Sequence, residues 1–174
     1  MKRWVAYLVV AWSLCGAFAS CGESDDYLVK QEELIEKYLT SQQLEYTNEG
    51  GTYKVVLAEG DQSRVAQRGD SLTFNYAGFL FESSPKGLFT TSWEYLLSDD
   101  EGLNTEYWSF EPKRVKLGDG TIIKGIENAL GNCCEGDSLQ LFITSDLGYG
   151  DEEVGAVSKN SALMFLVKVE KIDK

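Results

Sequence analysis

The sequence predicts an α+β domain, in which an antiparallel β-sheet of about five strands is accompanied by one short α-helix. Several runs between residues 52 and 170 alternate apolar and polar side chains, the pattern of half-buried strands. The pairs Gly69-Asp70 and Gly136-Asp137 open two of these runs, where turn residues are expected. Residues 123–130 have room for about two helical turns between strands.

The N-terminus, residues 1–20, has the layout of a secretory signal peptide. Lys2 and Arg3 are followed by an apolar run over 4–12 and then by small residues, with no acidic residue. This run is short for a stable membrane span, which needs about 20 apolar residues. We therefore expect residues 1–20 to be a signal peptide.

The residues at the end of this segment, Phe18-Ala19-Ser20-Cys21, resemble the lipobox of bacterial lipoproteins, in which the Cys is lipidated. Phe18 stands where Leu is usual, and the rival Cys15 follows a Leu that is too bulky for the cleavage pocket. The alternatives are an uncleaved N-terminal helical anchor and a plain secretory signal. Lipidation of Cys21 predicts a lipid-anchored protein of the cell envelope, outside the cytoplasm, on the periplasmic face or at the cell surface.

Residues 21–51 are expected to form a lipidated tether and a short helix. The acidic residues 22–26 suit a solvated tether, and they also resemble signals that send lipoproteins to the cell surface in some Gram-negative lineages. Residues 27–40 place apolar side chains at helical spacing against Lys and Glu. A helix of this length is marginal alone, so it should pack on the domain rather than on a second copy. The oligomeric state is left open.

The strands are predicted from alternating runs in the remainder of the chain. In residues 71–81, for example, one face carries Leu72, Phe74 and Tyr76, and the other carries Thr73, Asn75 and Ala77. The predicted strands are 53–57, 71–81, 114–117, 139–144 and 163–169.

Residues 90–112 interrupt this strand pattern. They combine five aromatic residues with six acidic ones, and this aromatic content argues against a disordered linker. A long loop in a compact domain is usually functional or carries structure of its own. The acids lack the spacing and the central Gly of a calcium loop, so no metal is expected here.

The chain is acidic and contains no histidine. Its formal net charge is −12, and it becomes −14 without residues 1–20, which hold two cations and no acid. Such a charge repels nucleic acid, so a nucleic-acid-binding function is excluded. The lack of His excludes Ser-His-Asp and Cys-His catalysis and His-ligated zinc.

Cys133 and Cys134 are the thiols of the predicted domain. Adjacent cysteines rarely bridge each other, because the closed ring strains the peptide between them. A redox pair would normally have two residues between its thiols. We therefore predict two buried free thiols.

Segments in a fixed order resemble the FKBP-type peptidyl-prolyl isomerases. Residues 69–78 (GDSLTFNYAG) resemble the strand that carries the family's first pocket tyrosine, and residues 117–130 (LGDGTIIKGIENAL) resemble the segment that forms the pocket floor. Residues 136–150 resemble the next strand and its tyrosine-bearing loop, and residues 160–169 resemble the last strand. The resemblance covers residues 52–174. It implies a twisted antiparallel sheet wrapped around one short helix, with an apolar pocket between them.

This resemblance also implies which residues bind proline-containing polypeptide segments. The Tyr149 hydroxyl and the Ile123 backbone N–H would hold substrate carbonyls, and Ile126 would form the floor. An isomerase of this kind needs no nucleophile, cofactor or metal. The implied catalytic residues are Tyr149, Tyr76, Phe165 and Ile123, and the implied substrate-binding residues are Phe89, Ile122, Ile126 and Val157.

Several positions depart from the family pattern. Ile126 stands where Trp is usual, Thr90 replaces an Asp, and Lys113 stands where an aromatic wall residue is expected, although Phe110 could substitute for it. The 90–112 insertion lies next to the pocket wall and could cover or extend it. These departures bear on the activity more than on the fold.

Three functions are compatible with the sequence. The preferred hypothesis is an extracytoplasmic peptidyl-prolyl cis-trans isomerase that assists the folding of exported proteins. The second is a non-catalytic FKBP-like binding module of the cell envelope that uses residues 90–112 as its contact surface. The third is a structural accessory lipoprotein of a larger envelope complex.

Overall fold

The structure is a computed structural model that describes residues 23–97 and 109–174. Cys21, the predicted lipidation site, and residues 98–108 of the predicted insertion lie outside the described residues. The elements are α1 (Glu23–Ser41), β1 (Thr47–Glu49), β2 (Thr52–Ala58), β3 (Asp61–Val65), β4 (Ser71–Phe81), β5 (Pro85–Thr91), η1 (Glu94–Leu96), β6 (Lys113–Lys116), α2 (Lys124–Leu130), β7 (Cys134–Glu135), β8 (Ser138–Ile143), η2 (Ser145–Leu147) and β9 (Ala162–Asp173).

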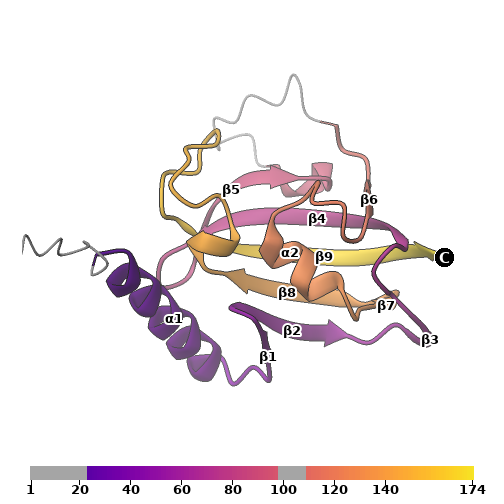
Figure 1. The fold of residues 1–174 in the computed structure, drawn as a ribbon, viewed down its shortest axis with the longest axis horizontal. Helices are drawn as coiled ribbons and strands as arrows, with labels where there is room; N and C mark the ends of the chain where they lie inside the picture. Colours follow the sequence, from indigo (N-terminus) through magenta and orange to yellow (C-terminus); the bar gives the residue numbers. More distant parts are fainter. Residues whose placement is uncertain (1–22, 98–108) are drawn as a thin grey trace, which may run out of the picture.

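The described strands form one large antiparallel sheet in the order β1-β2-β8-β9-β4-β5, with β6 also paired to β4 (Figure 1). The predicted α+β fold is confirmed, and the predicted strands are β2, β4, β6, β8 and β9. The sheet gains β1 and β5 at its edges, and β3 pairs separately with β7. β1 and β7 escaped the sequence pattern because they are short, and β3 because it is exposed along its whole length. In β5 the buried residues Leu88 and Thr91 are three positions apart, so the strand shows no alternation.

One face of the sheet packs against α2. The largest core cluster joins Ile126, Ala129 and Leu130 of the helix to alternate residues of β8 and β9. Gly125 allows the close approach, because a Cβ there would lie 2.3 Å from a methyl carbon of Ile143 in β8. This contact leaves the residues before α2 facing the sheet, which is where the pocket forms.

The opposite residues of the same strands pack against α1. Ile35 and Leu39 are fully buried in a second cluster with Tyr53, Phe142 and Met164. This explains why β8 and β9 are apolar on both faces. The predicted packing of the N-terminal helix on the domain is confirmed, and the helix is longer than the predicted 27–40. Among the described residues, no helix combines the length and apolar character that a membrane crossing requires.

Candidate functional site

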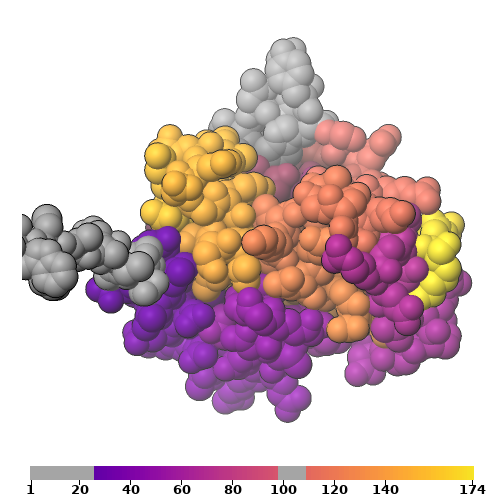
Figure 2. All heavy atoms as spheres, in the orientation of Figure 1, coloured from indigo at the N-terminus to yellow at the C-terminus, as the bar shows by residue number. Residues whose placement is uncertain are grey.

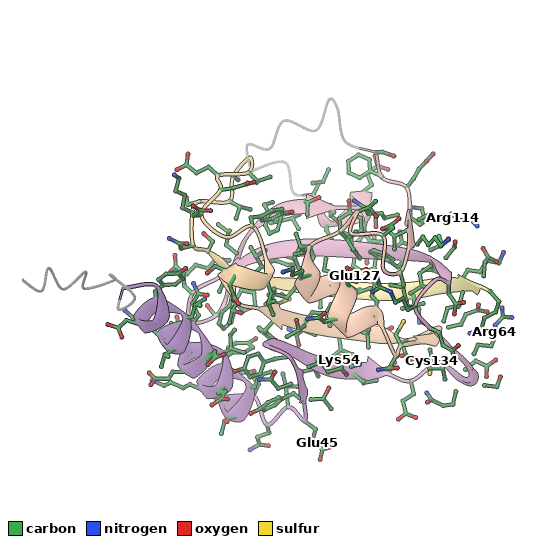
Figure 3. All side chains as sticks on the ribbon, in the orientation of Figure 1. Glu45, Lys54, Arg64, Arg114, Glu127 and Cys134 are labelled. Carbon is green, nitrogen blue, oxygen red and sulfur yellow. The ribbon has the colours of Figure 1, made fainter. Side chains whose placement is uncertain are left out.

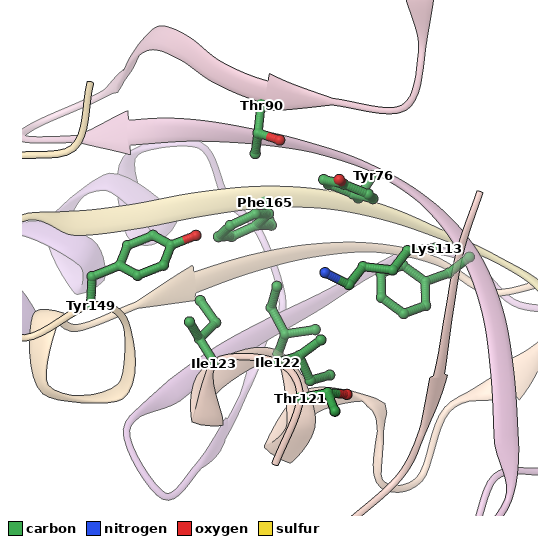
Figure 4. Close-up of a pocket in the computed structure, with 10 residues that line it drawn as sticks. Tyr76, Thr90, Lys113, Thr121, Ile122, Ile123, Tyr149 and Phe165 are labelled. Carbon is green, nitrogen blue, oxygen red and sulfur yellow. The ribbon is translucent and has the colours of Figure 1, made fainter. Parts of the chain in front are cut away.

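A partly open cavity of about 300 Å³ lies between the sheet and the start of α2 (Figure 4). It receives side chains from β4, β5, β6, β9, the segment before α2, α2 itself, and the loop after β8. Its lining residues are Phe74, Tyr76, Thr90, Lys113, Thr121, Ile122, Ile123, Ile126, Tyr149 and Phe165.

The sheet side of the cavity is formed by aromatic residues of β4 and β9. Tyr76 is fixed through its backbone, since its N–H donates to the Ser92 Oγ at 2.8 Å and its carbonyl accepts from the Thr91 Oγ1 at 3.1 Å. Gly78 pairs with Phe165 across the two strands. A Cβ at Gly78 would lie 2.7 Å from the Phe165 ring, so glycine is needed for this wall to close.

The opposite side of the cavity is the turn that leads into α2. The Asp119 carboxylate accepts from both the N–H and the hydroxyl of Thr121, at 3.0 and 2.8 Å. Ile122 and Ile123 follow, half-buried, with Ile123 at the position before the helix in an extended conformation. The backbone N–H of Ile123 donates to no other described residue. It is therefore available to an acceptor on a bound chain.

Tyr149 closes the cavity from the loop after β8. Hydrogen bonds from Gly150 N–H to the Ser145 carbonyl and from Asn160 N–H to the Gly150 carbonyl, both 2.7 Å, fold this loop back on itself. The Tyr149 hydroxyl points across the cavity toward Phe165, and within the described part of the chain it has no hydrogen-bond partner (Figure 4). Burial, with a smaller contribution from Tyr76, raises the pKa of this hydroxyl above its ordinary value, so it stays protonated and able to donate.

Six of the eight predicted site residues line the cavity together: Tyr76, Ile122, Ile123, Ile126, Tyr149 and Phe165. The other two do not line it. The Phe89 ring packs edge-on against Phe165 and Tyr149, with ring centroids 5.7 and 6.4 Å apart, and Val157 is buried in the core.

The three positions that were expected to depart from the family pattern also face the cavity. Thr90, Lys113 and Ile126 all line it. These positions stand out in the sequence because their residues differ from those expected in the family. Phe74 and Thr121 were not predicted as site residues. Phe74 could have been found from the alternation of β4, because it lies two residues before Tyr76 on the same face.

The two adjacent thiols lie away from the cavity. Cys133 and Cys134 are both free and buried, as predicted, and Cys134 begins β7 (Figure 3). Burial, and then the neighbouring Asp137 carboxylate, raises the pKa of the Cys133 thiol to about 12. A thiol with this pKa is not a nucleophile at neutral pH. In the described part of the chain, no group of three or more carboxylate or thiol side chains is placed to hold a metal ion.

The site therefore offers aromatic and aliphatic walls, a free tyrosine hydroxyl and a free backbone N–H. Such a set can enclose a small apolar ring and hold the carbonyls beside it. An α+β domain with an apolar, partly open pocket between its helix and its sheet is thus the class of protein that the fold and the site define.

Comparison with known proteins identifies the family within this class. Residues 62–170 match the FKBP-type peptidyl-prolyl cis-trans isomerases, and the chain belongs to that family. It is 28% identical over 125 residues to FK506-binding protein 1 of Aspergillus oryzae, covering 71% of this chain and 99% of that protein. It is 32% identical over 114 residues to FK506-binding protein 2 of Podospora anserina. That match covers 64% of this chain and 53% of the relative, so the chain spans about half of its length.

A solved bacterial structure shows the same fold. The crystal structure of FkpA from Escherichia coli superposes with a TM-score of 0.63 at 25% sequence identity. The superposition covers 86% of this chain and 60% of the FkpA chain.

Proposed function

We propose that this protein is an extracytoplasmic peptidyl-prolyl cis-trans isomerase that assists the folding of exported proteins. One observation carries the proposal: Tyr149 and Ile123 line the same cavity as Tyr76 and Phe165, and neither the Tyr149 hydroxyl nor the Ile123 N–H has a hydrogen-bond partner among the described residues. The names of its relatives support it, among them a mouse peptidyl-prolyl cis-trans isomerase that is 28% identical over 114 residues.

The cavity suits this reaction because the reaction needs shape rather than reactive groups. Rotation about an X-Pro bond crosses a barrier of about 18–20 kcal/mol, which arises from amide resonance. The twisted amide has lost this resonance and is less polar than the planar one. An apolar pocket that binds the twisted form more strongly than the planar form lowers the barrier.

Each side chain has a defined part in this proposal. The proline ring enters between Tyr76 and Phe165 and rests on Ile126. The Tyr149 hydroxyl and the Ile123 N–H donate hydrogen bonds to substrate carbonyls on either side of it. Phe89 holds the Phe165 and Tyr149 rings in place by edge contacts. A carbonyl held in this way stays still while the proline side of the bond rotates.

The envelope location rests on the N-terminal sequence. Residues 1–20 have the signal-peptide layout, and Cys21 follows a lipobox-like sequence. We propose that Cys21 carries the lipid and that the domain acts on proline-containing segments of exported chains beside an envelope membrane.

The test is the rate of cis-trans exchange of a short X-Pro peptide with the purified protein. We expect acceleration over buffer, and a decrease in kcat/KM of about two- to tenfold for Tyr149→Phe, because one hydrogen bond is worth about 0.5–1.5 kcal/mol. Tyr46→Phe, on the exposed Tyr46 outside the cavity, is the matched control. If the folded protein accelerates cis-trans exchange in none of the X-Pro peptides, the proposed isomerase activity is refuted.

That outcome would favour the second candidate, a binding module without activity. The start of the 90–112 segment supports this candidate, because the Tyr95 side chain is 77% exposed and lies 6.2 Å from Trp93 between ring centroids. Both residues border a groove that Leu57 and Leu166 also line. Residues 98–108 of this proposed contact surface lie outside the described residues.

A further inference from the structure

The lysine that replaces an aromatic wall residue is placed by the sheet so that it faces the pocket. Lys113 begins β6 and lies opposite Phe74 of β4. Paired residues of adjacent strands project to the same face of a sheet. Phe74 is fully buried, and the next same-face pair, Val115 and Leu72, is also buried in the core below the cavity. Lys113 therefore projects toward the interior face at the point where that face opens.

The Lys113 ammonium is the one charged group among the described residues that line the cavity. Its Nζ points into the space beside Ile122 and Tyr76 (Figure 4). No hydrogen bond or ion pair joins it to any residue of the described ranges. In a chain with a formal net charge of −12, this cation has no described acid as its partner.

We propose that Lys113 is a specificity-determining residue that selects substrates with an acidic side chain within one residue of the proline. This inference rests on the proposed isomerase function. A proline ring seated against Phe165 and Ile126 brings the flanking side chains to the rim of the cavity, where the ammonium lies. A carboxylate there pairs with Lys113, whereas a substrate lysine is repelled.

The expected size of this selection follows from the exposure of Lys113. Lys113 is an exposed residue, so its ion pair with a substrate carboxylate would remain in contact with water. The free energy of the pair should therefore be that of an ordinary surface ion pair. We expect kcat/KM for a peptide with Glu beside proline to exceed that for its Gln counterpart by about two- to fivefold at low salt. The ratio should fall toward one in about 0.5 M salt, because exposed charges are screened.

The experiment measures cis-trans exchange by NMR, without a coupled protease whose own preference could interfere. Matched peptides carry Glu, Gln or Lys immediately before the proline, and a second set carries them immediately after it. Lys113→Met keeps the aliphatic stem and should abolish the Glu preference, which is read as the ratio of the Glu to the Gln peptide rates within the variant. Lys113→Glu should reverse the preference toward Lys.

Lys116→Met is the control, because Lys116 is an exposed lysine of the same strand, three residues away and thus on the other face. It should keep the Glu preference. If exchange is accelerated in all peptides, but equally for Glu and Gln in both sets, the proposed role of Lys113 is wrong. The proposed isomerase activity would be unaffected by that result. Acceleration of none of the peptides would instead overturn the isomerase itself, and this inference with it.

Discussion

At the scale of single residues, the pocket depends on a glycine that touches no substrate. Gly78 lies in β4 beneath the rings of Phe165 and Phe89, and an added Cβ would lie 2.7 and 2.8 Å from them. Neither ring can withdraw easily, since Phe165 is buried in the core and Phe89 packs against both Phe165 and Tyr149. A single methyl group here must displace the wall of the pocket.

We therefore expect Gly78→Ala to lower the free energy of unfolding by about 1–3 kcal/mol, the usual cost of overpacking. It should also reduce kcat/KM for an X-Pro peptide, because both aromatic walls shift. Urea unfolding and the exchange assay measure the two effects. Gly131→Ala is the control, since its nearest contact would be 3.4 Å away, and it should change neither quantity appreciably. Unchanged stability and activity in Gly78→Ala would contradict the packing described here.

At the scale of elements, α1 is coupled to the loop that carries Tyr149. The Gln31 side chain donates to the Asn160 carbonyl at 2.8 Å and accepts from the backbone N–H of Ser145 at 2.9 Å. It thereby joins both ends of the loop, and the surfaces of α1 and this loop adjoin (Figure 2). The N-terminal helix is part of the support of the pocket, not a free tether.

Removal of this link should loosen the loop. Gln31→Ala is expected to lower the free energy of unfolding by about 1–2 kcal/mol, because it removes two hydrogen bonds and leaves the buried Ser145 N–H unpaired. Amide hydrogen exchange at Ser145 and Gly150 should accelerate, and kcat/KM should fall. Gln42→Ala serves as the control, since among the described residues that side chain makes a single hydrogen bond, to the Ser41 hydroxyl at 3.4 Å. Unaltered exchange across the loop would show that Gln31 does not position it.

The elements also show how far the sequence determines this fold. In β4, β8 and β9, alternate residues are buried under α2, and this period of two marked the three segments as strands, although β8 and β9 carry apolar residues on the other face as well. The same pattern could not show that Phe142 and Met164 meet α1 on the other face, since a period of two does not name the partner element. Within the site, motif order predicted Tyr149 and Ile123. Thr121 lines the cavity because the turn held by its hydrogen bonds to Asp119 places it there. The periodicity of the sequence does not reveal the conformation of such a turn.

At the scale of the whole molecule, charge and the N-terminus bear on membrane attachment together. The chain without residues 1–20 would carry a formal charge of −14, so anionic headgroups repel it. Cys21 lies two residues before α1, and α1 is packed on the sheet through Ile35 and Leu39. A lipid on Cys21 would therefore hold the pocket-bearing domain close to the bilayer, because the intervening tether is short.

Lipidation at Cys21 can be tested by metabolic labelling with a fatty acid in a bacterial host. The protein should incorporate the label, Cys21→Ser should lose it, and Cys15→Ser should keep it, because Cys15 follows Leu14 rather than two small residues. Covalent acyl chains are needed here, since each buried CH₂ contributes about 0.8 kcal/mol of membrane affinity and the acidic surface contributes none. If the label persists in Cys21→Ser, or never enters the unaltered protein, the proposed lipidation of Cys21 is wrong. The pocket and its tests would be unaffected by that result, because the Tyr149, Lys113 and Gly78 experiments all use purified protein.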